Sequence, residues 1–174
     1  MLNKYYPIST PAVLRKFIDS YIPLVFNQIE NFKIPFKKFN IHGDHLGLQT
    51  ISADEFDLVN DQLQNYSTLV KAGEIHNRRN NIYKLNNFVE SGGIQIQSVE
   101  VFEPKPGANI SKLKPGFEHI AIKVDEYEKL VDFFDKNNLP IDKSSEFNGS
   151  KFFKTKLINM IEIEFRNDFL WKVV

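Results

Sequence analysis

The chain has 174 residues, of which 42% are hydrophobic, enough for one compact core or for two small fused units around a shared core. Its 22 basic and 22 acidic side chains balance, which leaves no net field to attract nucleic acid or an anionic membrane. Cysteine is absent, so disulfides and thiolate metal sites are excluded, and any metal would need His, Asp or Glu ligands. No apolar run is long enough to span a bilayer, and we expect a cytoplasmic protein.

The first 40 residues predict a helical extension ahead of the main domain. Apolar side chains recur at helical spacing over residues 11–33, and Pro23 is expected to kink or divide this helix. The remaining residues, 41–174, are expected to form one domain.

Two similar segments begin the two halves of this domain. "GDHLGLQTI" at residues 43–51 and "GFEHIAIKV" at 116–124 are each typical of a short strand in which a histidine follows an acidic residue. These histidines are His45 and His119. An amphipathic helix with the spacing of a capping box follows each strand. The two capping pairs are Ser52 with Glu55, and Asp125 with Glu128. The repetition predicts a duplicated structural unit.

Three strand-like runs follow each helix and are separated by polar or glycine-containing turns. They are residues 68–75, 80–86 and 93–103 in the first half, and 140–147, 150–156 and 158–165 in the second. Each half, about 41–104 and 116–166, is therefore predicted to be a βαβββ unit with its helix on one face. The expected fold class is α+β: two such units form a curved mixed sheet, a cup with flanking helices and the N-terminal helical layer. Pairing of the bare faces predicts a cleft for a small molecule.

Alternation along the strands predicts which side chains face this cleft. In the first strand of each half, the apolar residues fit the helix-covered face, which leaves His45 and His119 on the cleft side. The last strand, "MIEIEFR", places Glu162 and Glu164 on the same side. Three strands therefore direct two imidazoles and one or two carboxylates toward one place.

The strand "GIQIQSVEVFEP" has a less regular pattern. The valines on either side of Glu100 favour it as a cleft-facing residue, but two isoleucines share its parity, so we expect a bulge near Ser98. By alternation, Asp44 and Glu118, which precede the two histidines, should point away from the cleft. A set of two His and two Glu would suit Zn, Ni, Co, Mn or Fe(II).

The paired units, with a histidine at the start of the first strand of each half, resemble the vicinal-oxygen-chelate superfamily, which includes glyoxalase I, methylmalonyl-CoA epimerase and extradiol dioxygenases. The order "DHLGLQ", "NRRNNIYKL", "VEVFEPKPG", "GFEHIAIKV" is more narrowly similar to its bacterial YecM-type branch, over roughly residues 40–166. In the superfamily, the metal ligands come from the first, fourth, fifth and last strands. The ligands implied here are His45, Glu100, His119 and Glu164, with Glu162 an alternative to Glu164 and Glu103 a weaker alternative to Glu100.

The resemblance also implies a mechanism. A divalent metal would bind neighbouring oxygens of a small oxygen-rich substrate and stabilise an enolate or oxyanion as a Lewis acid. A ligand carboxylate, Glu164 or Glu100, would move the proton in an isomerase, lyase or oxygenase reaction. Arg78 matches an arginine of the YecM-type branch and would bind a substrate carboxylate or phosphate, and Gln49 and Lys123 are further candidates for substrate contact. Superfamily members often pair, so a monomer and a homodimer are both expected possibilities.

The same residues have plainer interpretations. A single histidine in a strand is usually structural, and only its repetition favours a ligand. His42 and His76 have no such counterpart and are expected at the surface. A decayed site, a metal-free cup for a hydrophobic compound, and a metal-binding module without chemistry all stay open. Arg78 and Arg79 lie in a polar region where solvated arginines are common, and "SGGI" at 91–94 is typical of a hairpin turn rather than of a phosphate cradle.

Overall fold

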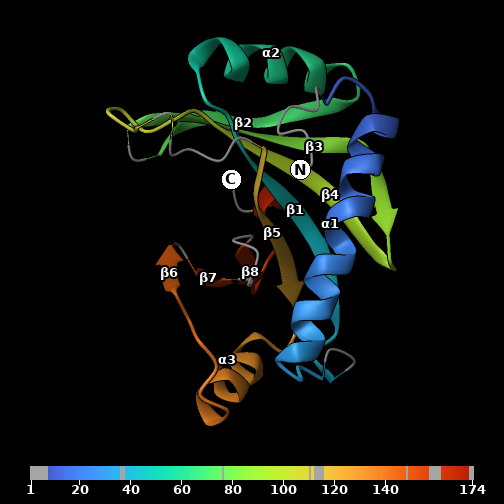
Figure 1. Cartoon of the computed structure of the whole chain (residues 1–174), viewed down its shortest axis with the longest axis vertical. Coiled ribbons are helices and arrows are strands. Elements are labelled where there is room, and N and C mark those ends of the chain that lie inside the picture. The colour runs from blue at the N-terminus through green and yellow to red at the C-terminus, as the bar shows by residue number, and fades with distance from the viewer. Residues whose placement is uncertain are drawn as a thin grey trace.

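The chain folds around one mixed sheet with helices packed on it (Figure 1). The computed structural model describes residues 8–35, 38–75, 77–109, 111, 116–147, 149–156 and 162–172. The first half contains β1 (Ile41–Gln49), α2 (Ala53–Gln64), β2 (Ser67–Ile75), β3 (Arg78–Ser91) and β4 (Ile94–Phe102). The second half contains β5 (Gly116–Val124), α3 (Tyr127–Lys136), β6 (Lys143–Phe147), β7 (Ser150–Lys156) and β8 (Glu162–Arg166). Helix α1 (Pro11–Asn31) precedes both halves, and the 3-10 helix η3 (Leu170–Lys172) follows them.

The strand order places the first strand of each half at the centre of the sheet. The order is β2-β3-β4-β1-β5-β8-β7-β6. β1 and β5 pair antiparallel, while β4 runs parallel to β1, and β8 runs parallel to β5. This arrangement confirms the predicted α+β class and its two βαβββ units. It also brings the four strands that carry the predicted metal ligands next to one another.

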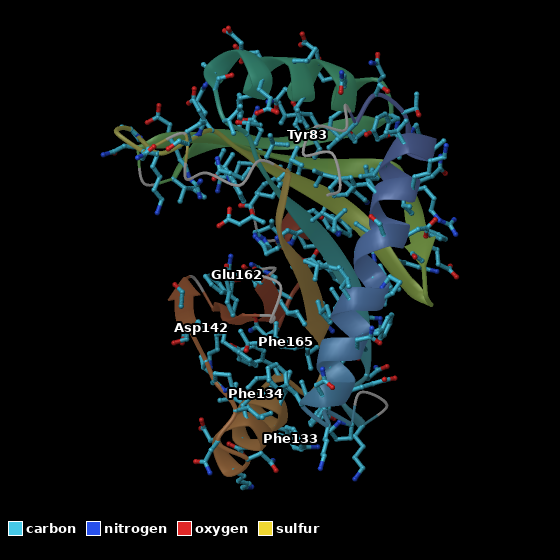
Figure 2. The ribbon with its side chains drawn as sticks, in the orientation of Figure 1. Tyr83, Phe133, Phe134, Asp142, Glu162 and Phe165 are labelled. Carbon is cyan, nitrogen blue, oxygen red and sulfur yellow. The ribbon has the colours of Figure 1, made fainter. Side chains whose placement is uncertain are left out.

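Each unit covers the outer face of its strands with its own helix. Under α2, the hydroxyl of Tyr83 donates to Oδ1 of Asn60 at 2.7 Å. Under α3, the ring of Phe134 lies 5.6 Å from that of Phe165 on β8. Figure 2 shows these two rings between α3 and β8, with Glu162 on the side of the strand away from α3. The helices therefore leave the opposite face of the central strands free for polar side chains.

The predicted capping box forms in the first helix and not in the second. At α2, Oγ of Ser52 accepts from the Glu55 N–H at 3.1 Å, and Glu55 Oε2 accepts from the Ile51 N–H at 2.6 Å. At α3, the N-cap is Glu126, and its side chain makes no capping hydrogen bond. Asp125, which the sequence predicts as the cap, instead contacts Asn40 and Lys123. The capping prediction is wrong there because these partners occupy the carboxylate.

Helix α1 runs through Pro23 without being divided. Its apolar stripe is buried and includes Leu14, Ile18, Val25 and Ile29. Gly92, in the turn between β3 and β4, lies against Ile22 and Phe26 of this helix. Gly92 and Gly93 both have positive φ, at 57° and 80°, as a two-residue hairpin turn requires. The predicted hairpin at "SGGI" is therefore confirmed. None of the described helices is long and apolar enough to cross a membrane.

The predicted bulge lies in other strands than expected. β4 pairs with β1 without interruption from Ser98 to Phe102, and the β3–β4 register shifts on the β3 side, between Lys84 and Val89. The β1–β5 register shifts between Gly43 and Leu46, where β1 has one extra residue. It shifts again between Gly47 and Leu48, where β5 has one. The first bulge therefore contains Asp44 and His45, and the second contains Glu118, directly before His119.

Candidate metal centre

Three of the predicted ligands meet on one face of the central strands. Gly47 of β1 pairs with Glu100 of β4 on one side and with His119 of β5 on the other, and His45 lies two residues away on β1. Because side chains two apart on a strand share a face, the three polar groups converge. We call the face that carries His45, Glu100 and His119 the inner face. Both histidines are buried.

The spacing of the three donor atoms fits a common ion. Nε2 of His45 lies 3.0 Å from Nε2 of His119. Oε2 of Glu100 lies 3.6 Å from the first nitrogen and 3.5 Å from the second. Ligands about 2.0–2.1 Å from a tetrahedral ion lie about 3.3–3.4 Å apart. The residues present therefore match the size of a divalent transition-metal site.

Asp44 orients the ring of His45. Its Oδ2 lies 2.9 Å from Nδ1 of His45, and because a carboxylate only accepts, this nitrogen donates. The Leu170 N–H also donates to Asp44, at 3.1 Å. Burial alone would lower the pKa of His45, but the Asp44 and Glu100 carboxylates outweigh it and raise the pKa to about 9. The expectation that Asp44 points away from the histidines is wrong, because the bulge in β1 breaks the alternation.

The ring of His119 lies against Gly47 of β1. A Cβ built on Gly47 would lie 2.1 Å from Cε1 of His119, so only glycine leaves room for this ring. Phe102 stacks on His119, with its ring centroid 5.9 Å from that of His119 and an interplanar angle of 23°. Burial, with the charge of Lys154, lowers the pKa of His119 to about 3. The ring is therefore neutral and able to bind a metal.

Glu100 directs a single oxygen at the histidines. Its Oε1 accepts from Nδ2 of Asn80 at 3.0 Å, which leaves Oε2 toward His45 and His119. Burial would raise the pKa of Glu100, but His45, as donor and as charge, outweighs it and lowers the pKa to about 2. Glu103, the predicted rival, is bound by Arg79 at 3.0 Å and lies outside the donor group.

Glu164 is close to the donors but is held by basic residues. Its Oε2 lies 3.9 Å from Nε2 of His119 and 3.1 Å from Nζ of Lys154, and its Oε1 lies 2.7 Å from Arg166. Burial would raise the pKa of Glu164, but His119 and Lys154 outweigh it and lower the pKa well below the usual range. Glu162, the alternative to Glu164, lies 3.6 Å from the same lysine.

Comparison with known proteins finds likeness in structure alone. The sequence matches no family model and no curated protein. A solved structure described as structural genomics protein EC4020 is similar with a TM-score of 0.66 and 16% identity, over 91% of this chain and 90% of that one. Hypothetical protein BH1468 from Bacillus halodurans C-125 is similar with a TM-score of 0.50 and 18% identity, over 73% of this chain and 94% of that one. Methylmalonyl-CoA epimerase from Mycobacterium tuberculosis reaches 0.48 at 17% identity, over 72% and 86%.

Two βαβββ units in one sheet, in the order observed here, decide the fold. The chain shares the fold of these solved structures, and this fold has the two βαβββ units that the predicted resemblance implies. The narrower resemblance to the YecM-type branch stays a prediction. Within this fold, the candidate metal centre lies where the two units join, because its histidines come from the paired strands β1 and β5.

Two of the three predicted substrate contacts lie beside the donors of the candidate metal centre. Arg78 donates to Oε1 of Gln49 at 2.7 Å, and its guanidinium carbon lies 4.4 Å above the ring of Phe102. Phe102 in turn stacks on His119. Lys123, the third, lies four residues along β5 from His119, about 13 Å at strand rise, and pairs with Asp125. The geometry therefore gives no support to Lys123 as a substrate contact.

Glu118 also departs from the expected alternation. It is the extra residue of β5 at the second bulge. Its Oε2 is buried and has no hydrogen-bond partner among the described residues. Burial raises the pKa of Glu118, and the charges of Lys154 and Arg78 oppose this rise. A bulged residue does not follow strand alternation, which is why the expectation for Glu118 fails.

Several residues around the donors were not predicted from the sequence. They are Asn80, Lys154 and Arg166. Strand alternation could have found two of them: Phe153 is buried under α3, so its neighbour Lys154 faces inward, and Arg166 shares the parity of Glu164. His42 is exposed, at 42%, as predicted, and His76 lies outside the described residues.

Proposed function

We propose that the chain is a metal-dependent enzyme of isomerase, lyase or oxygenase type that acts on a small oxygen-rich metabolite. The observation that supports this proposal most is the triangle of 3.0, 3.5 and 3.6 Å between donor atoms of His45, His119 and Glu100. Imidazole and carboxylate donors suit Zn, Ni, Co, Mn or Fe(II). A bound ion would supply a Lewis acid for neighbouring substrate oxygens. The absence of cysteine agrees with the expected cytoplasmic location.

Arg78 is proposed to bind an anionic group of the substrate. Among the described residues, Arg15, Arg79 and Arg166 each contact a carboxylate, whereas Arg78 contacts none. Its Nε is buried and has no hydrogen-bond partner in this part of the chain. Gln49 and the Phe102 ring hold the guanidinium in place, so its remaining donors are already oriented. A carboxylate or phosphate would satisfy them through paired charge-assisted hydrogen bonds.

Glu100 and Glu164 keep their predicted role in proton transfer as part of this proposal. The pKa of each carboxyl lies below its usual range, so each is ionised at neutral pH. An ionised carboxylate is the form that a general base requires. Both groups lie within 4 Å of His119, which supports a place for them beside the proposed metal.

Metal analysis of protein purified without a chelating tag tests the proposed site. We expect close to one ion per chain in the wild type and a loss of it in His45→Ala and in His119→Ala. His42→Ala is the matched control, because this histidine is exposed and pairs with Asp125 outside the donor group. Metal content that stays the same in both inner-face variants would reject the assignment.

A ligand panel then separates an enzyme from a metal-binding module without chemistry. The metal-loaded protein is titrated with diketones, hydroxy acids and catechols, and changes in the metal spectrum are followed. Binding with turnover of one class supports the proposed function. Metal binding without a response to any class would favour the non-catalytic alternative.

A further inference from the structure

We propose that Lys154 and Arg166 hold Glu164 as their counter-ion, so that the metal is bound by His45, Glu100 and His119 alone. This inference rests on the proposed metal site and concerns its ligand set. It makes Lys154 a positioning residue, because its ammonium decides whether the carboxylate of Glu164 can reach the metal.

Both oxygens of Glu164 are already engaged by cations. Arg166 lies 2.7 Å from Oε1, and Lys154 lies 3.1 Å from Oε2. Oε2 of Glu164 lies farther from the candidate metal centre, at 3.9 Å from Nε2 of His119. Glu164 therefore lies beside the donor group and outside it.

The two glutamates of the inner face differ in their partners. Glu100 gives one oxygen to the neutral amide of Asn80 and turns the other toward the histidines. Glu164 has a positive charge at each oxygen. The positive charge that Glu100 faces is the proton of His45, a proposed metal ligand, and this proton leaves when a metal binds. Glu164 lies between two cations that stay, so it must first leave an ion pair to bind a metal.

Leaving that pair would be costly because the groups are buried. The side chains of Glu164 and Lys154 are 5% and 12% exposed. Removing one partner of a buried ion pair leaves an uncompensated charge, which is strongly unfavourable. Among the described residues, Glu162 is the other carboxylate beside Lys154, and it is farther away, at 3.6 Å, and 24% exposed. The remaining partner would compensate the ammonium only in part.

The backbone fixes this ion pair. Lys154 and Glu164 are direct partners in the β7–β8 register, and Arg166 lies two residues beyond Glu164 on the same face of β8. Arg166 is also anchored by Asp168 at 3.1 Å and lies 3.6 Å from Asp44. The pairing of β7 with β8 therefore brings the backbone of Lys154 next to that of Glu164, and their side chains start from neighbouring positions.

A three-ligand site differs in its chemistry from a four-ligand site. Two histidines and one carboxylate would leave more positions of an ion open to substrate oxygens than a four-ligand set would. One carboxylate ligand instead of two gives the site less negative charge, which favours an anionic substrate. This agrees with Arg78, which contacts no carboxylate among the described residues.

Cobalt(II) is a suitable probe, because its affinity and its visible spectrum both report the ligand set. We compare Glu164→Gln with Glu100→Gln by competition against a chromophoric chelator. We expect Glu164→Gln to bind Co²⁺ within about threefold of the wild type and with the same spectrum, and Glu100→Gln to lose roughly 100-fold in affinity, at least as much as loss of a supporting residue costs. A loss in Glu164→Gln as large as that in Glu100→Gln would overturn the inference.

Lys154→Met tests the part played by the lysine, and Lys154→Arg is its matched control. With the ammonium gone, Glu164 can reach the ion, so we expect Lys154→Met to bind Co²⁺ roughly tenfold more tightly and with an altered spectrum, since affinity rises with the number of charged ligands. The double variant with Glu164→Gln should return to the wild-type spectrum. An unchanged spectrum in Lys154→Met, or a double variant that keeps the altered one, would contradict the role of Lys154.

The ion pair can also be measured without metal, which separates this inference from the proposed function. In EDTA, thermal unfolding of the two single variants and the double variant forms a double-mutant cycle. Coupling between Lys154 and Glu164 supports the pair even if the wild type binds no Co²⁺, an outcome that would reject the metal site alone. Additive effects of the two substitutions would overturn the ion pair.

Discussion

The imidazole of His119 fills the space that a side chain at position 47 would need, so Gly47 and His119 fit together across the β1–β5 pair. The ring can approach His45 to 3.0 Å because β1 has no Cβ at this point. The glycine in "DHLGLQ" thus belongs to the construction of the site as much as the histidine before it does.

Gly47→Ala should therefore weaken metal binding while the sheet stays intact. The new Cβ would lie 2.1 Å from the ring of His119, which must move away from the ion. We expect a loss of roughly 10- to 100-fold in Co²⁺ affinity, the size found when a group that orients a ligand is disturbed. Gly73→Ala on β2 is the control, since its Cβ would meet only Lys71, at 3.9 Å. Wild-type affinity in Gly47→Ala would show that His119 does not bind the ion from this position.

Asp44→Asn should lower metal affinity through the orientation of His45. The substitution removes the charge that fixes Nδ1–H and with it the preference for an Nε2 lone pair directed at the ion. A decrease of roughly 10- to 100-fold in a chelator competition is expected. Asp125→Asn serves as the control, because this aspartate lies 3.3 Å from the exposed His42. Equal affinities in the two variants would exclude an orienting role for Asp44.

Metal binding should release about one proton per chain at pH 7.5. The pKa of His45 is raised to about 9, so this ring is protonated at pH 7.5 in the metal-free protein, whereas His119, with a pKa lowered to about 3, is already neutral. A ligating ring must be neutral, so affinity should rise with pH up to about 9 and fall as pH decreases below it. Calorimetry in buffers with different heats of ionisation counts the proton. Binding heats that do not depend on the buffer would contradict this prediction.

Arg78→Met should weaken the binding of anionic ligands and leave the metal in place. We expect a hydroxy acid with a second carboxylate to bind the Co²⁺-loaded variant roughly tenfold or more weakly, because a charge-assisted hydrogen-bonded pair is lost, while catechol binding stays the same. Arg78→Lys should restore only part of the affinity, since an ammonium lacks the planar fork. Arg79→Met is the control, because Glu103 and Asp57 already pair with Arg79. Equal losses for both ligands would instead indicate damage to the metal site.

The architecture was largely predictable because its signals are local. The histidine-bearing strands, the amphipathic helices and the turn at "SGGI" each appear in short windows of sequence, and their repetition predicts two βαβββ units. Alternation placed His45 and His119 on one face, and it favoured Glu100 on that face in spite of the phase change along its strand. It failed at Asp44 and Glu118, because each lies at a bulge where the β1–β5 register shifts. Bulges of this kind depend on pairing between strands about 70 residues apart, and no short window of sequence shows them.

Lys154 and Glu164 show what the sequence determined and what only the tertiary structure decided. The sequence by itself determined that both residues belong to strands and that Glu164 shares a face with the other predicted ligands, because strand parity is a property of neighbouring residues. Only the tertiary structure decided that Lys154 pairs directly with Glu164 and that Arg166 takes its second oxygen. The physical reason is that an ion pair depends on the register of β7 against β8 and on burial from water, and both arise only when the whole sheet has formed.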